Sequence, residues 1–358
     1  MMCAAVIAAS PATIAEAQSS RTVIATGLNN PRGLAFGPDG ALYVVEAGRG
    51  GSSTLCLPEQ AAPPGTTRCY GPTGAITRIT ATGQHRVATG LPSLAVPGGA
   101  GATGPHDISF GFGAAWVTIG LAADPAVRAP FEAAGIRLGR LVQVSTSTGQ
   151  WTPVVDIAAH EAAANPDGGH VESNPYGLRV LSDRAVVADA GANALLNIAA
   201  TGQVSTLAVF PPRLSPNPFG PGMIPAESVP TAVAESPDGN FYVGELTGFP
   251  FPVGGARIFR VPRNGGTPVV VAEGFTNIIA IAVDASGAGY ILEHDADGII
   301  RPGTAGRLTR VHANGTMTVW ANADLTAPGG VVIGPDGAVY VTNRSTSAGG
   351  GEVVRFTP

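Results

Sequence analysis

The sequence predicts an all-β fold, a six-bladed β-propeller whose blades are four-stranded antiparallel sheets. Three observations predict it. A strand–turn–strand phrase occurs six times along the 358 residues, a second strand–turn–strand pair follows five of the copies, and a strand near the start of the chain can complete the last unit. Repeated four-stranded units are typical of propeller blades arranged around a central channel.

The six phrases share a short apolar strand, a tight turn and a second strand. The three clearest copies turn at Gly-Pro-Asp-Gly or Ser-Pro-Asp-Gly, where Pro presets one turn position, Asp bonds to the local backbone and Gly takes a positive φ. The copies occupy residues 30–46, 104–119, 174–189, 229–245, 277–293 and 327–343. We assign them as strands A and B of each blade, with A nearest the axis.

The outer strands, C and D, follow as further strand–turn–strand pairs. They occupy residues 74–89, 139–155, 194–209, 256–272 and 306–321. The sixth unit has only one more strand, at 351–358. The segment RTVIATGL, residues 21–28, resembles the outer strands of the other units, and an unpaired sheet edge invites aggregation. We therefore expect 21–28 to complete the last blade and close the ring.

The composition excludes several classes of protein. The chain has 50 Gly and 31 Pro, yet its 44% hydrophobic content is enough to fill a core, so it is not a disordered chain. All 20 basic residues are arginine, so there is no phosphate-loop or Schiff-base lysine. A net charge of −5 argues against non-specific nucleic-acid binding, which needs a basic surface.

The N-terminus predicts export. Within residues 1–17 an apolar stretch precedes Ala15-Glu16-Ala17, which fits the small-x-small pattern of a signal-peptide cleavage site. We expect cleavage near Ala17, leaving 18–358 as a single secreted propeller domain. No later run reaches about 18 apolar residues, so we expect no membrane span. In an exported chain the remaining pair, Cys56 and Cys69, most simply forms a disulfide.

The long loops all belong to one face of the predicted propeller. The A–B and C–D turns lie on one side, which we call the turn face, and the B–C and D–A connections lie on the other, which we call the long-loop face. The long segments are all of the second kind: 47–73, 120–138, 158–173, 211–228, 247–254 and 294–305. Long loops on a rigid scaffold commonly carry binding. We expect the binding site on the long-loop face, around the channel.

The last residues of the B strands bring acidic groups to that face. These positions hold Glu46, Asp189, Glu245 and Glu293, with an amide, Asn343, in the sixth unit. Converging carboxylates would bind a hard cation such as calcium. The competing interpretation is structural, since recurring blade positions usually serve the blade, each acid capping loop amides or pairing with arginine.

The first residues of the A strands differ from blade to blade and several are polar, which is more typical of a site than of architecture. Arg32, His106 and Tyr176 are examples. Two further alternatives follow: an acid–base site with Glu293 or His106 as the base, and a transition-metal site. The histidines for such a metal would be His106, His160, His170 and His294. Serine nucleophile chemistry finds no support, because G-x-S-x-G is absent.

Two loop phrases add candidate binding residues to Arg32, His106 and Asn343. In NPDGGHVESNPYGL (165–178), Asn174 and Tyr176 stand at alternate positions and would share one side of an extended segment. In GELTGFPFPVGG (244–255), Phe249 and Phe251 lie between Pro and Gly. An exposed aromatic pair could stack on a planar or carbohydrate ligand. The alternative is that both rings pack beneath their own loop.

Several of these phrases resemble the ScyD/ScyE family, named after the cyanobacterial gene cluster for the pigment scytonemin. They are NPDGG…SNPYGL, VADAGANALL (187–196), ESVPTAVAESPDGNFYVGELTGFPFPVGGA (227–256), TNIIAIA (276–282), APGGVVIGPDGAVYV (327–341) and STSAGGGEVVRF (345–356). The resemblance covers essentially the whole mature chain. It implies an exported propeller similar to the NHL type, and it supplies no catalytic residue.

Two functional hypotheses follow from the sequence. The first is a secreted binding or scaffold protein, expected to be a monomer, whose long-loop face holds a small molecule, a glycan or a partner protein. The alternative is a calcium-assisted hydrolase, lactonase-like or lyase-like, with its site at the channel mouth. There the ion would polarise a carbonyl or activate water.

Overall fold

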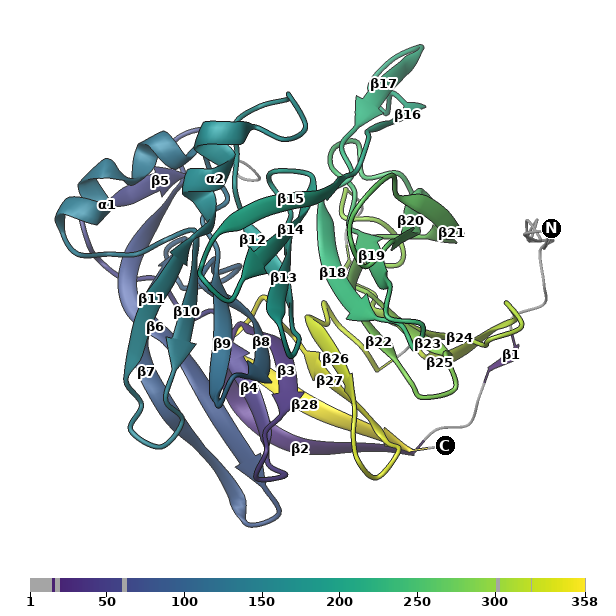
Figure 1. Cartoon of the computed structure of the whole chain (residues 1–358), viewed down its shortest axis with the longest axis horizontal. Coiled ribbons are helices and arrows are strands. Elements are labelled where there is room, and N and C mark those ends of the chain that lie inside the picture. Colours follow the sequence, from purple (N-terminus) through teal and green to yellow (C-terminus); the bar gives the residue numbers. More distant parts are fainter. Residues whose placement is uncertain (1–14, 17–19, 60–62, 301–302, 323, 358) are drawn as a thin grey trace.

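In the computed structural model, six antiparallel four-stranded blades follow one another around a central axis (Figure 1), which confirms the predicted fold. The structure describes residues 15–16, 20–59, 63–300, 303–322 and 324–357. The predicted signal peptide therefore lies outside the described residues, apart from the short strand β1 (Ala15–Glu16), which runs parallel to β25.

The strands of blades 1 to 5 run outward from the axis in chain order, and blade 6 takes its outer strand from the start of the chain. Blade 1 contains β3 (Pro31–Phe36), β4 (Leu42–Glu46), β6 (Thr67–Thr80) and β7 (Gly83–Ala95). Blade 2 contains β8 (Pro105–Gly111), β9 (Ala114–Ile119), β10 (Arg140–Val144) and β11 (Trp151–Asp156). Blade 3 contains β12 (Pro175–Val180), β13 (Arg184–Asp189), β14 (Ala194–Ala199) and β15 (Val204–Val209).

The second half of the ring repeats this order. Blade 4 contains β18 (Pro230–Glu235), β19 (Phe241–Glu245), β20 (Ala256–Val261) and β21 (Val269–Phe275). Blade 5 contains β22 (Ile278–Val283), β23 (Gly289–Glu293), β24 (Arg307–Val311) and β25 (Met317–Ala321). Blade 6 contains β26 (Gly330–Ile333), β27 (Val339–Asn343), β28 (Ala348–Thr357) and β2 (Ser20–Asn29).

The ring closes as predicted, because β2 pairs antiparallel with β28. The register runs from Ser20 opposite Thr357 to Asn29 opposite Ala348. The first long strand of the chain thus becomes the outer strand of the last blade. This pairing gives the last blade its fourth strand and covers an edge that would otherwise expose unpaired N–H and C=O groups.

The Pro-Asp-Gly turns form as their chemistry requires. Gly40, Gly239 and Gly337 take φ values of 74°, 78° and 75°. Such positive φ values suit glycine, because it has no Cβ to clash with the backbone. The preceding Asp accepts a hydrogen bond from the amide two residues on, for example from Ala41 to Asp39 at 3.2 Å. Each turn thus fixes the spacing of strands A and B.

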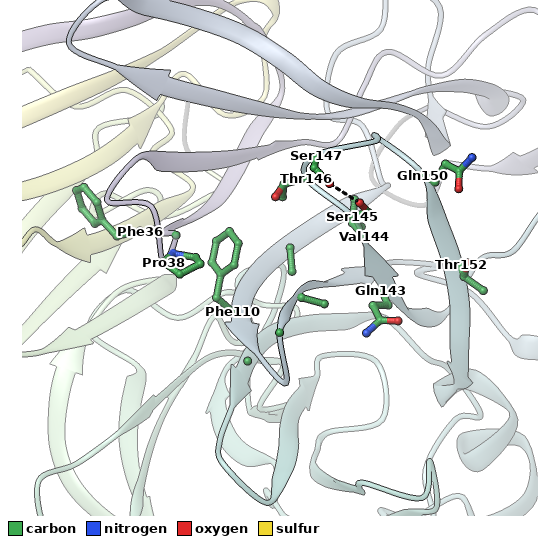
Figure 2. A pocket seen from close by; sticks show the side chains of 15 residues that line it. Phe36, Pro38, Phe110, Gln143, Val144, Ser145, Thr146, Ser147, Gln150 and Thr152 are labelled. Atoms are coloured by element: carbon green, nitrogen blue, oxygen red, sulfur yellow. Dashed lines mark hydrogen bonds between the residues drawn. The ribbon is translucent and has the colours of Figure 1, made fainter.

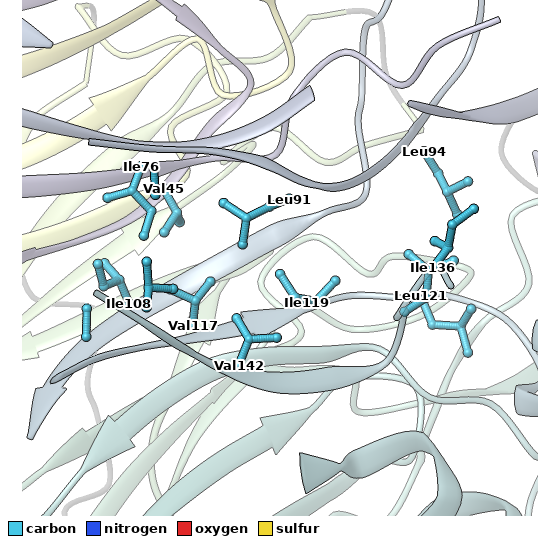
Figure 3. Close-up of a cluster of buried hydrophobic side chains, with 14 of the residues drawn as sticks. Val45, Ile76, Leu91, Leu94, Ile108, Val117, Ile119, Leu121, Ile136 and Val142 are labelled. Carbon is cyan, nitrogen blue, oxygen red and sulfur yellow. The ribbon is translucent and has the colours of Figure 1, made fainter. Parts of the chain in front are cut away.

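Apolar side chains from neighbouring blades form the core. Between blades 1 and 2, Val45 and Ile76 pack in one cluster with Ile108, Val117 and Val142 (Figure 3). Alternate residues of a strand point to opposite faces, so the next residue, Leu141, packs instead in the cluster between blades 2 and 3. Each blade is therefore buried on both faces by its neighbours.

The longer connections carry the remaining elements. They are β5 (Cys56–Pro58), the 3-10 helix η1 (Pro125–Arg128), α1 (Ala129–Ala133), α2 (Ile157–Ala164), β16 (Arg213–Pro216) and β17 (Met223–Ala226). Figure 1 places β5, α1, α2 and the β16–β17 hairpin on the same side of the propeller, in the upper part of the view. This placement agrees with the predicted long-loop face.

The predicted disulfide is present. Cys56 and Cys69 join β5 to the start of β6, with 2.03 Å between the sulfurs. The bond fastens a long insertion of blade 1 onto the blade itself. None of the helices among the residues that the structure describes has the length and apolar character that crossing a membrane requires.

Candidate functional site

The B-strand glutamates are bound within their own blades. In blade 1, the buried Glu46 accepts hydrogen bonds from Arg86 at 2.9 and 2.7 Å and from the Thr77 hydroxyl at 2.6 Å. Its Oε2 also accepts the backbone N–H of Asn29 at 2.8 Å. Both carboxylate oxygens are therefore occupied, and this acid ties the entry of strand A to the end of strand B.

Glu245 and Glu293 repeat this arrangement in blades 4 and 5. Arg257 donates to both oxygens of Glu245, at 2.5 and 3.0 Å. Arg307 does the same for Glu293, at 2.5 and 2.6 Å. Both glutamates are fully buried. Because each arginine donates two hydrogen bonds to one carboxylate, the pair fixes the orientation of both side chains as well as neutralising their charges.

The B-strand ends of blades 3 and 6 cap backbone amides. Asp189 accepts the Ser173 hydroxyl and the Asn174 amide, both at 2.6 Å, and burial raises its pKa. In blade 6, Oδ1 of Asn343 accepts the Thr326 amide at 2.7 Å. The contacts of the four acids, in blades 1, 3, 4 and 5, thus support the structural interpretation.

These contacts bear on the calcium hypothesis. Among the residues that the structure describes, no group of three or more His, Cys, Asp or Glu side chains lies close enough to share a metal ion. Calcium binding by Glu46, Asp189, Glu245 and Glu293 stays a prediction. It would require the arginines to give up their carboxylates, so the donor set as it stands does not fit the ion.

The A strands converge on the channel. A cavity of about 50 Å³ lies in the channel, and A-strand residues of all six blades line it. Its polar side chains are those of His106, Asp107, Tyr176 and Thr231. The predicted residues His106 and Tyr176 meet here, with their rings stacked at 4.4 Å between centroids.

His106 and His294 share one hydrogen-bonding arrangement. Nδ1 of His106 lies 3.1 Å from the carbonyl oxygen of Pro175, and Nδ1 of His294 lies 2.8 Å from that of Pro328. Because a carbonyl oxygen only accepts, each Nδ1 must carry the hydrogen. In a neutral ring this leaves the Nε2 lone pair available to a ligand.

Both rings are neutral over the physiological pH range. Burial, together with the positive charge of Arg32, lowers the pKa of His106 to about 3 and that of His294 to about 4. Arg32 itself is 8% exposed and donates to the carbonyl of Ala102 and the hydroxyl of Ser345. Arg32 acts electrostatically on both rings, so we group the three side chains as neighbours at the mouth.

A glycine makes room for this site. A Cβ on Gly120 would lie 2.2 Å from Cε1 of His106 and 2.7 Å from Oδ1 of Asn174. Asn174 also accepts the amide of Leu121 at 3.3 Å, so it reaches the mouth as predicted. The channel-mouth cluster consists of Arg32, His106, Asn174, Tyr176 and His294, and this name is kept below.

The remaining predicted residues lie elsewhere. Nε2 of His160 is 3.0 Å from the Thr206 hydroxyl, and His170 is exposed on the loop before β12. Asn343 serves blade 6, as described above. Glu293, a candidate base, has both oxygens engaged by Arg307 and the amide of Thr276.

The predicted aromatic pair is exposed and has a third member. Phe249 is 48% exposed and Phe219, in the β16–β17 hairpin, is 79% exposed. Their rings stack at 5.9 Å with 17° between planes, and Phe251 meets Phe249 edge-on at 6.3 Å. The alternative in which both rings are buried beneath their own loop therefore does not describe Phe249.

A larger groove, of about 790 Å³, opens on the turn face (Figure 2). It is lined by the A–B turns of blades 1 and 2 and by residues 143–147, 150 and 152 of blade 2. Its aromatic members are engaged elsewhere: Phe36 packs against Tyr340 of blade 6 and Phe110 against Tyr43. The lining gathers no charged side chain, so we place the candidate site at the channel mouth.

Three residues at the mouth escaped sequence reasoning. Gly120 has no signal other than its place after a B strand. Asp107 directly follows His106, and burial raises the pKa of its carboxyl to about 7. Arg68 is the residue before Cys69, in the stapled insertion, and this adjacency was a signal that could have been used.

Comparison with known proteins agrees with the fold. No family model and no curated protein matches the chain, so the ScyD/ScyE resemblance stays a prediction. Among solved structures, the chain is similar to streptogramin B lyase, with 12% identity over 95% of this chain and 97% of that one, at a TM-score of 0.51. These neighbours are six-bladed β-propellers.

Two further structures show the same architecture. One is a catalytically inactive histidine variant of virginiamycin B lyase from Staphylococcus aureus, solved with quinupristin. It is 14% identical over 95% of this chain and 99% of its own, with a TM-score of 0.52. The other is PQQ-bound aldose sugar dehydrogenase from Streptomyces coelicolor, 15% identical over 96% and 99%, with a TM-score of 0.52. At such identities the likeness establishes fold alone.

Proposed function

We propose that this propeller is an exported protein that binds a small molecule at the mouth of its central channel, on the long-loop face. The Cys56–Cys69 disulfide supports export, since such bonds persist in oxidising compartments. Cleavage near Ala17 and a monomeric state are part of this proposal.

One observation carries the proposal. In the channel-mouth cluster, two neutral histidines present free Nε2 atoms beside a buried arginine and a tyrosine. Polar groups placed only for architecture satisfy one another, as the B-strand acids do. At the mouth, no described residue bonds Nε2 of either histidine, and His106 and Tyr176 line a small cavity, which is typical of a ligand site.

The histidine pKa values favour binding over proton transfer. A general base works best when its pKa lies near the working pH. Rings with pKa values of about 3 and 4 are weak bases at neutral pH, so they suit acceptance of a hydrogen bond from a ligand. The exposed rings of Phe219 and Phe249 offer a second surface on the same face, where a sugar or planar group could stack.

The experiment is a ligand screen with matched histidine variants. The wild-type protein is incubated with a metabolite extract, bound molecules are identified by native mass spectrometry, and thermal melting is repeated with each hit. We expect His294→Gln to lose the increase in Tm and His160→Gln, a histidine outside the mouth, to keep it. Equal shifts in all three proteins would place the ligand elsewhere.

An enzyme is the second candidate function, either a lyase or a hydrolase. The supporting observation is the fixed tautomer of His106, whose Nε2 points its lone pair away from the anchoring carbonyl of Pro175. The similar fold of virginiamycin B lyase, inactive as a histidine variant, makes this candidate worth testing. Turnover of an identified ligand by wild type, lost in His106→Asn, would favour it.

Calcium assistance is tested separately. Thermal melting in EDTA and in added calcium chloride compares wild type with Glu245→Gln. If the four B-strand acids hold a calcium ion, EDTA lowers the Tm of wild type and the variant responds less. With each glutamate held by its own arginine, we expect the two conditions to give the same Tm.

A further inference from the structure

Two buried arginines at the channel mouth have only neutral hydrogen-bond partners among the described residues. Arg32, at the start of β3, donates to the Ala102 carbonyl at 2.9 Å and to the Ser345 hydroxyl at 3.3 Å. Arg68, in β6, donates to the Thr103 hydroxyl at 2.9 Å and to the Ala122 carbonyl. Arg32 is 8% and Arg68 4% exposed.

The two guanidinium groups are anchored on adjacent residues. Their anchors, Ala102 and Thr103, are consecutive residues just before β8, and both positive charges act on His106. In the described part of the chain, the Nε atom of each arginine is buried without a hydrogen-bond partner. Two like charges are thus gathered where water has been largely removed.

The surroundings compensate these charges only in part. Glu59 and Glu172 act electrostatically on Arg68, but neither forms an ion pair with it. Asp107, the residue after His106, accepts hydrogen bonds from the backbone amides of Ile108 and Leu178 and forms no ion pair with either arginine among the described contacts. Buried charges are normally paired, because removing a cation from water is costly. An anion bound between the two arginines would supply the missing partner.

The disulfide explains how Arg68 reaches this position. Arg68 stands next to Cys69 and opposite Leu57, in the short β5–β6 ladder that Cys56–Cys69 closes. This ladder is an extension of blade 1 on the long-loop face. The disulfide therefore fixes the segment that carries Arg68, whereas Arg32 comes from the start of β3.

We propose that the channel mouth recognises a small organic carboxylate, held between Arg32 and Arg68, with the free Nε2 atoms of His106 and His294 beside it. This inference rests on the proposed function and names its ligand class. A carboxylate suits the site because a guanidinium donates to its two oxygens in a planar fork. Because both histidines at the mouth are neutral, the two arginines supply the positive charge that an anion would meet.

The test compares charged and neutral probes of the same shape. Titration calorimetry with the full-length protein uses benzoate against benzamide and succinate against succinamide, at constant ionic strength set by sodium chloride. We expect binding of at least one carboxylate and none of its amide. Arg32→Gln and Arg68→Gln should each weaken that binding by about tenfold or more, the loss expected for one charge-assisted hydrogen bond.

Matched variants keep the result interpretable. Arg213→Gln removes an arginine that bonds the Gly255 carbonyl on the same face, so it controls for the change in net charge and should bind as wild type. Arg68→Lys keeps the charge and guards against misfolding of Arg68→Gln. Reducing Cys56–Cys69 should weaken carboxylate binding while leaving the circular dichroism of the blades unchanged.

Three outcomes would overturn the inference: amides that bind as tightly as carboxylates, arginine variants that bind as wild type, or no carboxylate bound by wild type. The proposed function fails separately. If a neutral ligand binds and His294→Gln abolishes its binding, the mouth is still a ligand site and only the anionic class is wrong.

Discussion

Arginines at two places in this propeller meet opposite surroundings. Within the blades, Arg257 and Arg307 each donate two hydrogen bonds to a fully buried glutamate. At the channel mouth, Arg32 and Arg68 are bound only by carbonyl and hydroxyl groups of the described residues. The first arrangement is complete and holds a blade together. The second is incomplete, and completing it requires a ligand.

The largest expected effect breaks a complete pair. Glu293→Ala leaves Arg307 without its carboxylate and the Thr276 amide without its acceptor, so we expect the free energy of unfolding to fall by about 3–5 kcal/mol. Urea denaturation at pH 7 measures it, and Glu245→Ala should behave alike. A loss below about 1 kcal/mol, the range of exposed ion pairs, would contradict the structural role.

The next effect concerns pH at the mouth. Because the pKa of folded His106 lies well below the unfolded value of about 6.5, the unfolded state takes up the proton first, and stability present above pH 6.5 is lost as pH falls. By pH 5 this amounts to about 2 kcal/mol for His106.

Urea denaturation at pH 8 and pH 5 checks this value against His106→Asn, which should lose about 2 kcal/mol less between the two conditions. Asp107, whose pKa burial raises to about 7, favours the folded state as pH falls. Its contribution is common to both proteins, so the difference isolates His106. Identical losses in the two proteins would show that His106 is not held neutral.

A smaller change in stability is expected when Arg32, which has only neutral hydrogen-bond partners among the described residues, is replaced. Arg32→Met replaces a buried cation by an apolar side chain of similar length, which is often neutral or stabilising. We expect the free energy of unfolding to stay within about 1 kcal/mol of wild type or to rise. A loss of several kcal/mol would mean that Arg32 serves the blade as Arg307 does.

The smallest effect lies on the turn face. Arg355 donates to Asp336 at 2.7 Å, and both side chains are about one-third exposed, at 32% and 38%. An exposed pair of this kind contributes little to stability, because solvent screens the two charges. Asp336→Asn should therefore lower stability far less than Glu293→Ala in the same assay, and an equal loss would remove the distinction between the two kinds of pair.

The sequence predicted the fold well because its signals are local. A Pro-Asp-Gly turn acts on its own four residues, and alternating side chains report which strand faces are buried. The strand that closes the ring could be found because five complete units showed what the sixth lacked.

The site was harder to predict because its determinants are distant in sequence. Glu46 is neutralised by Arg86, 40 residues away. Neither the repeat nor the spacing shows which arginine will reach which acid, so the sequence leaves both a calcium site and a set of structural caps open. Arg32, His106 and Tyr176 could be predicted because their A-strand positions lie near the axis, and Asn174 because it alternates with Tyr176 in the loop phrase. Arg68 lies in an irregular insertion without a repeat counterpart.

The β2–β28 pairing has a consequence for the order of folding. Residues 20–29 leave the ribosome early, but their partner strand occupies residues 348–357, at the other end of the chain. During synthesis, and again during any passage through a membrane, blades 1 to 5 have their own four strands before the ring can close. The closing strand must wait unpaired for the whole of that time, so the interval before closure is when this protein most needs protection from aggregation.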